Sequence, residues 1–539
     1  MRYIDNIPVY KQPISLKGYS YVDYSHGKLF VRGIDNNNQR VTFYCDYKPL
    51  VWVPLDFNYT KYNNDIEDVV FNTWHNMIDD TPLVGLRFTS IYSCNRFVRE
   101  NTTFNIEDGK RVGDTRIHTS PSNMYVSQYI TENFLDEIKL TSKDLRIITY
   151  DIETEVGHHD YDVNTPIKIK NINSSKIIET TIGDYEDLYN DGNYQINQYD
   201  QWVDYNDSIY RFKGQFPSPT QASEKITLIT VKDINHDVID TWGYDDFKST
   251  RDDIRYHKCV DETDLLTQFV NFIESDYPDA ISGWNTSQFD NTYVATRIKN
   301  VLGEEMMNRL SPEHHITFKQ VEFNEFGKST VETSWDGIAD LDYLRLYKKF
   351  TYGGRESYKL DAIAELEIGI QKLHNPMGGN FKEFYSGKYD IRNTPKQDDN
   401  EFIKLGYQRT QLRKQAREDT NYYKQFKQLD EQIVNKSKQL FIEYNIRDVE
   451  LVDKIDKKQR FFDLIMTIGY LSCCNFENVF SPVQTWDYKI YNTLYKRNKV
   501  IPIKRHGLKA EKFPGAYVKK PLVGKHNFCE SFDLDSLNK

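Results

Sequence analysis

The chain has 539 residues, which is too long for a single hydrophobic core and predicts about two to four domains. Its formal net charge of −11 excludes a protein that coats nucleic acid by overall positive charge, although a local groove can still bind DNA. The 6 cysteines form no Cys-x-x-Cys pair, so neither a zinc site nor a disulfide framework is indicated. No apolar run reaches the ~18 residues of a membrane span, and a reducing cytoplasm is expected.

The first 144 residues predict an α+β domain built from many short strands. Residues 28–44 hold two strand-like runs on either side of an Asn-rich turn, a pattern typical of a β-hairpin. Residues 62–80 alternate less regularly and are interpreted as helical. No residues in this region have catalytic spacing, so we interpret it as a scaffold or binding module.

A buried strand is predicted over residues 145–150, which are rich in β-branched and aromatic side chains and include neither Pro nor Gly. The strand leads into Asp151 and Glu153, and carboxylates two residues apart on a strand point to the same face. They repel one another there, and a divalent cation, which prefers oxygen ligands, removes that repulsion. The alternative interpretation is an exposed strand end with two solvated acids.

The chain after Glu153 contains a segment that is far longer than an ordinary loop. Residues 156–215 are rich in Asp, Asn and Tyr and are interpreted as an insertion, with a disordered loop as the alternative. Strands are predicted at 225–232 and 237–242, and an amphipathic helix over 261–274.

A short strand over 280–284 is predicted to end at Asn285, which forms the turn that leaves it. Phe289 and Asp290 open the next helix, which is expected to stop at Gly303. An acid in the first turn of a helix is often only a partner of the helix dipole. Both that role and a ligand role therefore remain open for Asp290.

Two further elements follow, a β-hairpin over 317–334 and a helix-like stretch over 340–350. Residues 381–438 are charged and polar and predict a solvent-facing helical hairpin. A helix is then predicted to start near Phe441.

Asp448 lies in an apolar stripe of that last helix, which is spaced by three- and four-residue steps. The stripe comprises Phe441, Tyr444, Asp448, Leu451 and Ile455. A buried acid needs a partner, which can be a salt bridge or a shared cation. Tyr444 lies one turn earlier, so its hydroxyl group can reach the same space.

Four acids, two on a predicted strand and two on predicted helices, can converge on one pair of cations. Two cations about 3.5–4 Å apart clamp an in-line phosphoryl displacement, in which one activates water and the other stabilises the departing 3′ oxygen. The acids in question are Asp151, Glu153, Asp290 and Asp448. The pattern therefore predicts metal-dependent phosphodiester hydrolysis.

Three motifs carry a family resemblance: Tyr-Asp-Ile-Glu-Thr at 150–154, Gly-Trp-Asn-x-x-x-Phe-Asp at 283–290 and Tyr-Asn-Ile-x-Asp-Val at 444–449. They resemble the three exonuclease motifs of family B DNA polymerases. Further stretches are similar to the replicative polymerases of T-even bacteriophages, namely 216–222, 345–350, 357–361, 480–487 and 513–518. Segments 156–215 and 381–438 have no clear counterpart and look like insertions.

The resemblance implies an α+β (mixed α/β) chain of three parts. Residues 145–460 would form an RNase H-like 3′–5′ exonuclease domain. Residues 1–144, completed by 461–504, would form a β-rich α+β N-terminal domain, and 505–539 would begin the polymerase palm.

The resemblance also assigns roles to individual residues. Asp151, Glu153, Asp290 and Asp448 match ligands of two Mg²⁺ or Mn²⁺ ions, Tyr444 matches the residue that orients the attacking water, and Asp533 matches a ligand of the polymerase metals. Lys372 matches a lysine beside the scissile phosphate, with a surface lysine as the alternative. The hairpin 317–334 would help to pass the primer end between active sites. The DNA-contacting residues would be Asn285, Phe289, Gly515, Ala516 and Tyr517.

The expected function is proofreading by the N-terminal part of a phage DNA polymerase, in the cytoplasm of an infected bacterium. Asn538 and Lys539 stand where the family continues with Tyr-Pro, so nucleotide addition is expected to need a C-terminal polymerase chain. A split subunit and an interrupted reading frame both remain open. Primer-template and single-stranded DNA, a sliding clamp and a single-strand-binding protein are the expected partners. The alternatives are a nucleic-acid-binding fragment without catalysis and a free-standing RNase H-like exonuclease.

Overall fold

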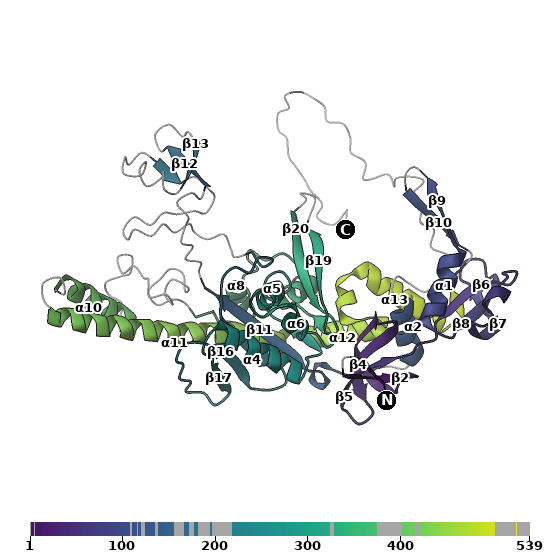
Figure 1. Ribbon diagram of the computed structural model, residues 1–539, viewed down its shortest axis with the longest axis horizontal. Coiled ribbons are helices and arrows are strands. Elements are labelled where there is room, and N and C mark those ends of the chain that lie inside the picture. Colours follow the sequence, from purple (N-terminus) through teal and green to yellow (C-terminus); the bar gives the residue numbers. More distant parts are fainter. Residues whose placement is uncertain are drawn as a thin grey trace. The chain divides into compact units, whose positions relative to one another are not determined.

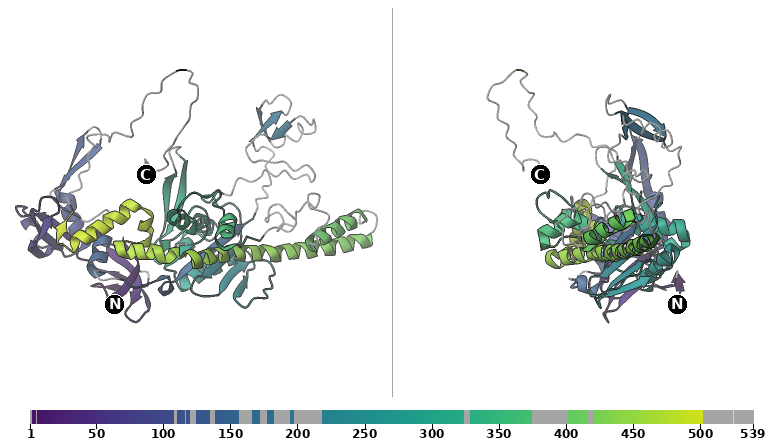
Figure 2. Two further views of the ribbon diagram at one scale, coloured as in Figure 1. Left: turned by 180° about the vertical axis from the view of Figure 1, so that it is seen from behind. Right: turned by 90° about the vertical axis from the view of Figure 1, so that its left-hand side faces the viewer.

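The structure is a computed structural model, shown in Figures 1 and 2. It describes residues 2–4, 6–107, 110–115, 117–119, 124–134, 138–155, 166–171, 177–181, 194–196, 218–323, 328–373, 401–415, 420–501 and 524. Helices and several sheets are mixed along the chain, which confirms the predicted α+β class. The chain divides into two compact units, one of residues 1–47 and 121–495 and one of residues 48–120 and 496–539. The domain limits inferred from the sequence stay a prediction.

The smaller unit contains a four-stranded sheet in the order β22-β7-β8-β6. Its elements are β6 (Leu50–Pro54), β7 (Ile66–Asn76), β8 (Pro82–Phe88), β9 (Thr102–Glu107), β10 (Lys110–Thr115), β22 (Lys499–Val500), α1 (Ile91–Asn101) and the 3₁₀ helix η1 (Thr60–Tyr62). The buried rings of Trp52 and Trp74 meet in its core with their centroids 5.2 Å apart.

The helical interpretation of residues 62–80 is wrong, because most of this segment is strand β7. The strand pairs antiparallel with β8 and parallel with β22. Its register against β8 shifts between Ile66 and Asp68 and again between Val70 and Trp74. Such irregularities interrupt the two-residue alternation that marks a strand in a sequence, which explains why the alternation looked poor.

The larger unit begins with a five-stranded sheet in the order β1-β2-β5-β4-β3. Its strands are β1 (Arg2–Ile4), β2 (Ile7–Tyr10), β3 (Leu16–Ser25), β4 (Lys28–Asp35) and β5 (Arg40–Cys45). The antiparallel β4–β5 pair confirms the hairpin predicted over 28–44. Arg32 on β4 is buried and donates hydrogen bonds to the backbone oxygens of Tyr277, Pro278 and Gly337, which joins this sheet to the next one.

A six-stranded mixed sheet in the order β17-β16-β15-β11-β18-β21 follows. Its strands are β11 (Ile147–Thr154), β15 (Ile226–Asp233), β16 (Ile239–Gly243), β17 (Ile254–Lys258), β18 (Ala280–Ser282) and β21 (Ala339–Asp340). Strand β21, with 2 residues, is too short to give a sequence pattern. Strand β11 lies inside the sheet, antiparallel to β15 and parallel to β18.

The two faces of β11 meet different layers. Ile148, Tyr150 and Ile152 belong to the main core cluster together with residues of α4 (Glu262–Ser275) and α5 (Asp290–Leu302). On the other face, residues of β15 and β16 pack against α11 (Thr420–Gln459), the long helix in Figures 1 and 2. Alternate residues of β11 therefore point towards α11, and these include Asp151 and Glu153.

The helix limits test several sequence predictions. Helix α5 ends at Gly303, whose φ of +94° lies in the region that favours glycine, so the predicted stop is confirmed. Helix α11 begins at Thr420 rather than near Phe441, because the charged segment before Phe441 continues the same helix. It pairs with α10 (Glu401–Gln415), which confirms a helical hairpin.

The remaining elements complete the larger unit. They are α2 (Met124–Asn133), η2 (Ser142–Asp144), α6 (Glu304–Asn308), α7 (Tyr343–Phe350), α8 (Leu360–Ile368), α12 (Phe461–Ser472), η4 (Phe476–Phe480), α13 (Pro482–Tyr495) and the strands β12 (Pro166–Asn171), β13 (Ile177–Thr181), β14 (Tyr194–Ile196), β19 (Ile316–Phe323) and β20 (Lys328–Trp335). The antiparallel β19–β20 pair confirms the hairpin over 317–334. Within 156–215, the described strands β12, β13 and β14 form a sheet of their own.

None of the described helices combines the length and the apolar character needed to cross a membrane.

We expect Gly283→Ala to destabilise the chain by about 1–3 kcal/mol, because Gly283 has a φ of +157° and no room for a side chain. An added Cβ would lie 2.5 Å from the backbone oxygen of Tyr150 and 2.4 Å from Thr286 Cγ2. Urea unfolding monitored by circular dichroism measures the loss. The matched control is Gly354→Ala, where no atom lies within 4 Å of the added Cβ. Equal stability of the two variants would contradict this account.

Candidate active site

The site begins with two acids on one face of β11. Asp151 lies opposite Thr230 and Glu153 opposite Leu228 in the antiparallel ladder with β15. The register shifts immediately after Glu153, so the ladder becomes irregular at the end of the site. The strand thus presents both carboxylates to the layer formed by α11, as the two-residue spacing predicts.

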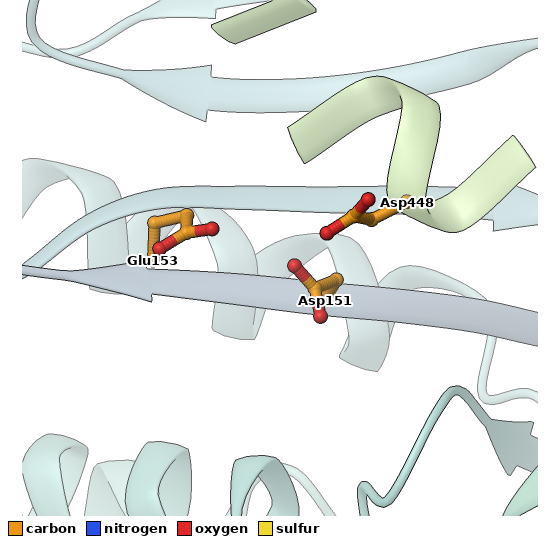
Figure 3. A group of neighbouring side chains, drawn as sticks. All are labelled: Asp151, Glu153 and Asp448. Carbon is orange, nitrogen blue, oxygen red and sulfur yellow. The ribbon is translucent and has the colours of Figure 1, made fainter. Parts of the chain in front are cut away.

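Helix α11 brings Asp448 to these two acids. One carboxylate oxygen from each of Asp151, Glu153 and Asp448 lies within 4.8 Å of the others. Figure 3 shows the three side chains, two from the strand and one from the helix. Asp448 is 4 % exposed and Glu153 is 7 % exposed, whereas Asp151 is partly exposed. Three acids so close together and so poorly solvated repel one another strongly unless a cation lies between them.

Asp290 reaches the same place from α5 but lies outside the group of three. It is 5 % exposed, and its Oδ1 accepts a hydrogen bond of 3.4 Å from the backbone nitrogen of Ile152, the residue between the two strand acids. The structure therefore places all four predicted acids together.

The loop before Asp290 is held by an acid that the sequence did not single out. The carboxylate of Asp342 accepts hydrogen bonds from the backbone nitrogens of Asn285, at 3.3 Å, and Ser287, at 3.1 Å. The same carboxylate caps the start of α7. Asn285 has a φ of +70°, as expected of the residue that turns out of β18.

Burial and mutual repulsion raise the pKa values of the acids in the metal-free site. Burial, followed by the charges of Asp290, Asp448 and Glu153, holds the pKa of Asp151 well above its usual range. Burial also raises the pKa of Asp290 to about 8, against the lowering effect of its backbone hydrogen bonds. The pKa of Asp448 rises to about 6 through burial, with Lys372 opposing the shift.

Lys372 supplies the positive charge beside these acids. Its Nζ lies 2.5 Å from Asp448 Oδ2 and donates a hydrogen bond of 3.2 Å to the hydroxyl oxygen of Tyr444. Burial alone lowers the pKa of Lys372, but its interactions with Asp448, Tyr444 and Asp151 outweigh burial and leave that pKa raised. The structure thus places Lys372 in the site, and its role beside a phosphate stays a prediction.

The donor set fits a hard divalent cation. Among the described residues, Asp448 Oδ1 is buried and has no hydrogen-bond partner, although a buried carboxylate oxygen ordinarily has one. The other oxygens available at this point also belong to carboxylates, which Mg²⁺ and Mn²⁺ prefer. A cation bound here would give Asp448 Oδ1 a partner, and it would also remove the repulsion between the carboxylates.

Sequence reasoning missed Asn445. Its Nδ2 donates a hydrogen bond of 2.7 Å to Asp151 Oδ2, and the side chain is fully buried. Position 445 lies four residues after Phe441 and three before Asp448, so the helical spacing that selected Asp448 also selects it. The signal was present, but an uncharged amide does not suggest metal chemistry.

Other predicted site residues lie elsewhere or cannot be placed. The ring of Phe289 packs against Tyr293, with centroids 5.2 Å apart, and borders the main core cluster. Contact of Asn285 and Phe289 with DNA stays a prediction. Gly515, Ala516, Tyr517 and Asp533 lie outside the described residues.

We expect Asp290→Asn to stabilise the metal-free protein increasingly as pH rises from about 4 to about 8. An unfolded Asp titrates near pH ~3.9, whereas the folded pKa of Asp290 is about 8. The folded chain therefore binds the extra proton between these values, and the stability from this group falls as pH rises. Thermal unfolding in EDTA at several pH values, compared with the unsubstituted chain, tests this. A difference in Tm that does not change with pH would contradict the assignment.

Comparison of the chain with known proteins identifies its family. The family profile described as "DNA polymerase family B, exonuclease domain" matches residues 88–363. The chain is 27 % identical over 521 residues to the DNA-directed DNA polymerase of Escherichia phage RB69, covering 96 % of this chain and 46 % of that protein. It is 32 % identical over 286 residues to the DNA-directed DNA polymerase of Enterobacteria phage T4, covering 53 % of this chain and 26 % of that protein.

A more distant relative extends the comparison beyond phages. The DNA polymerase catalytic subunit of Psittacid herpesvirus 1 is 23 % identical over 155 residues, which is 28 % of this chain and 14 % of that protein. The chain spans less than half the length of each of these relatives. The resemblance inferred from the three motifs is confirmed: the chain belongs to the family B DNA polymerases and carries their exonuclease domain.

Proposed function

We propose that residues 145–460 form a 3′–5′ exonuclease that removes nucleotides from single-stranded ends of DNA with the help of two divalent cations. The observation that carries this proposal is the meeting of three carboxylate oxygens within 4.8 Å, from β11 and α11, with Asp290 beside them. Membership of a family defined by an exonuclease domain supports the same reaction.

The cations would be held by Asp151, Glu153, Asp290 and Asp448. Mg²⁺ or Mn²⁺ is proposed because all of these ligands are oxygens. Two ions are proposed because the family resemblance implies a two-cation site and Asp290 lies beside the group of three acids. When bound, such ions supply an activated water and stabilise the charge that develops on the departing 3′ oxygen.

Tyr444 and Lys372 would position the reacting groups. Lys372 Nζ donates to the hydroxyl oxygen of Tyr444, which holds that hydroxyl group beside Asp448, where it would orient a water molecule. Burial, followed by the charge of Asp448, raises the pKa of Tyr444, so the hydroxyl stays protonated and serves as a donor. The ammonium group of Lys372 is placed to attract a phosphate towards a site that is otherwise negative.

DNA is proposed as the substrate because the relatives are DNA-directed DNA polymerases. A purely binding role explains the site less well, since clustered carboxylates repel a phosphate backbone unless cations intervene. Within the proposed exonuclease, the β19–β20 hairpin would guide the primer end, as the family resemblance implies.

We expect Asp151→Ala and Asp290→Ala each to reduce Mg²⁺- or Mn²⁺-dependent digestion of single-stranded DNA by at least about 10²–10³-fold, because each removes a cation ligand. The measurement is shortening of a 5′-labelled oligonucleotide by the full chain, resolved on a gel. The matched control is Asp246→Ala, since the side chain of Asp246 is 87 % exposed and lies outside the site. Digestion at the unsubstituted rate by either site variant would refute the exonuclease assignment.

Tyr444→Phe is expected to slow the same reaction by about 10- to 100-fold while leaving the affinity for Mn²⁺ unchanged. The reason is that the hydroxyl group orients water and is not a cation ligand. Calorimetric titration with Mn²⁺ and single-turnover digestion separate the two effects. A loss of Mn²⁺ affinity equal to the loss of rate would show that Tyr444 supports the cation instead.

A further inference from the structure

Asn445 makes a hydrogen bond that packing alone does not explain. It lies on α11 between Tyr444 and Asp448, is fully buried, and donates from Nδ2 to Asp151 Oδ2 at 2.7 Å. Within the described part of the chain, its own Oδ1 is buried without a hydrogen-bond partner. An apolar side chain of similar size would avoid that unsatisfied oxygen, so the donor group itself must be what the position requires.

The orientation of the amide follows from its neighbour. A cation ligand is ionised, and beside an ionised Asp151 a turned-over amide would point Oδ1 at a carboxylate oxygen, where two acceptors repel. The Nδ2 group is therefore the one that faces Asp151. Because this bond fixes one carboxylate oxygen, it also fixes the plane of the group and the position of the second oxygen.

We propose that Asn445 is a positioning residue that holds the carboxylate of Asp151 in the geometry needed to bind a divalent cation. This inference rests on the proposed function, in which Asp151 is a cation ligand. Carboxylate ligands are ordinarily held by hydrogen bonds from a surrounding layer, and loss of such partners weakens cation binding. Asn445 supplies that bond across the gap between α11 and β11.

A neutral donor suits this position better than a charged one. Asp448 is paired with the ammonium group of Lys372 at 2.5 Å, which already places one positive charge in the site. A second ammonium group at Asp151 would compete with an incoming cation, because like charges repel. The amide orients Asp151 without adding charge, so Asp151 keeps its full attraction for the cation.

The test measures Mn²⁺ binding to the full chain by calorimetry, with Mn²⁺ alone as the ligand. Asn445→Leu keeps the branching and the number of side-chain heavy atoms but removes the donor, and it is expected to weaken Mn²⁺ binding by about 10- to 100-fold. Saturating Mn²⁺ should then restore digestion of single-stranded DNA to within a few-fold of the unsubstituted rate. The control Asn492→Leu alters a buried amide on α13, a helix that carries none of the site acids, and should leave Mn²⁺ binding unchanged.

The outcomes separate this inference from the function on which it rests. If Asp151→Asn binds Mn²⁺ as tightly as the unsubstituted chain, the proposed cation site fails. If Asp151→Asn loses Mn²⁺ binding but Asn445→Leu does not, the acids bind the cation and the positioning role of Asn445 is refuted. Asn445→Ser, which is smaller and too short to reach Asp151, replaces Asn445→Leu if that variant does not fold. Reduced thermal stability with unchanged Mn²⁺ affinity in either variant would identify a merely structural residue.

Discussion

Repulsion between buried carboxylates is the constraint on which this site depends. Three carboxylate oxygens lie within 4.8 Å of one another, and burial removes most of the water that would screen them. The metal-free protein meets this repulsion by raising the pKa values of Asp151, Asp290 and Asp448. A fold that holds acids in this way binds a divalent cation favourably, because the cation replaces a repulsion with an attraction.

The fold tolerates the repulsion because one face of β11 packs in the core and only the other face carries the acids. Ile148, Tyr150 and Ile152 are buried against α4 and α5, in the main core cluster. That apolar face fixes the strand in place, since burial of large side chains contributes strongly to stability. The alternate residues on the other face can then be unfavourable without loosening the strand, which is why a core strand can carry Asp151 and Glu153.

Local patterns in the sequence predicted much of this arrangement. The strand before Asp151, the end of α5 at Gly303 and the helix face that includes Asp448 follow from residue type and spacing. Features set by distant contacts did not follow. Lys372 meets Asp448 across 76 residues of sequence, and neither segment alone indicates the pairing. Strand β7 was misread because its pairing partners, and not its own alternation, hold it extended.

Three of the four site acids are each supported by a different kind of donor. Asp448 is held by the charged Nζ of Lys372, Asp151 by the neutral amide of Asn445, and Asp290 by a backbone N–H. In the proposed function, a bound cation would compete only with Lys372, because only Lys372 brings positive charge of its own. The amide and the backbone N–H keep their hydrogen bonds unchanged. In the proposed function, the cation would therefore weaken the hold of Asp448 on Lys372, and the ammonium group would then be available to a phosphate.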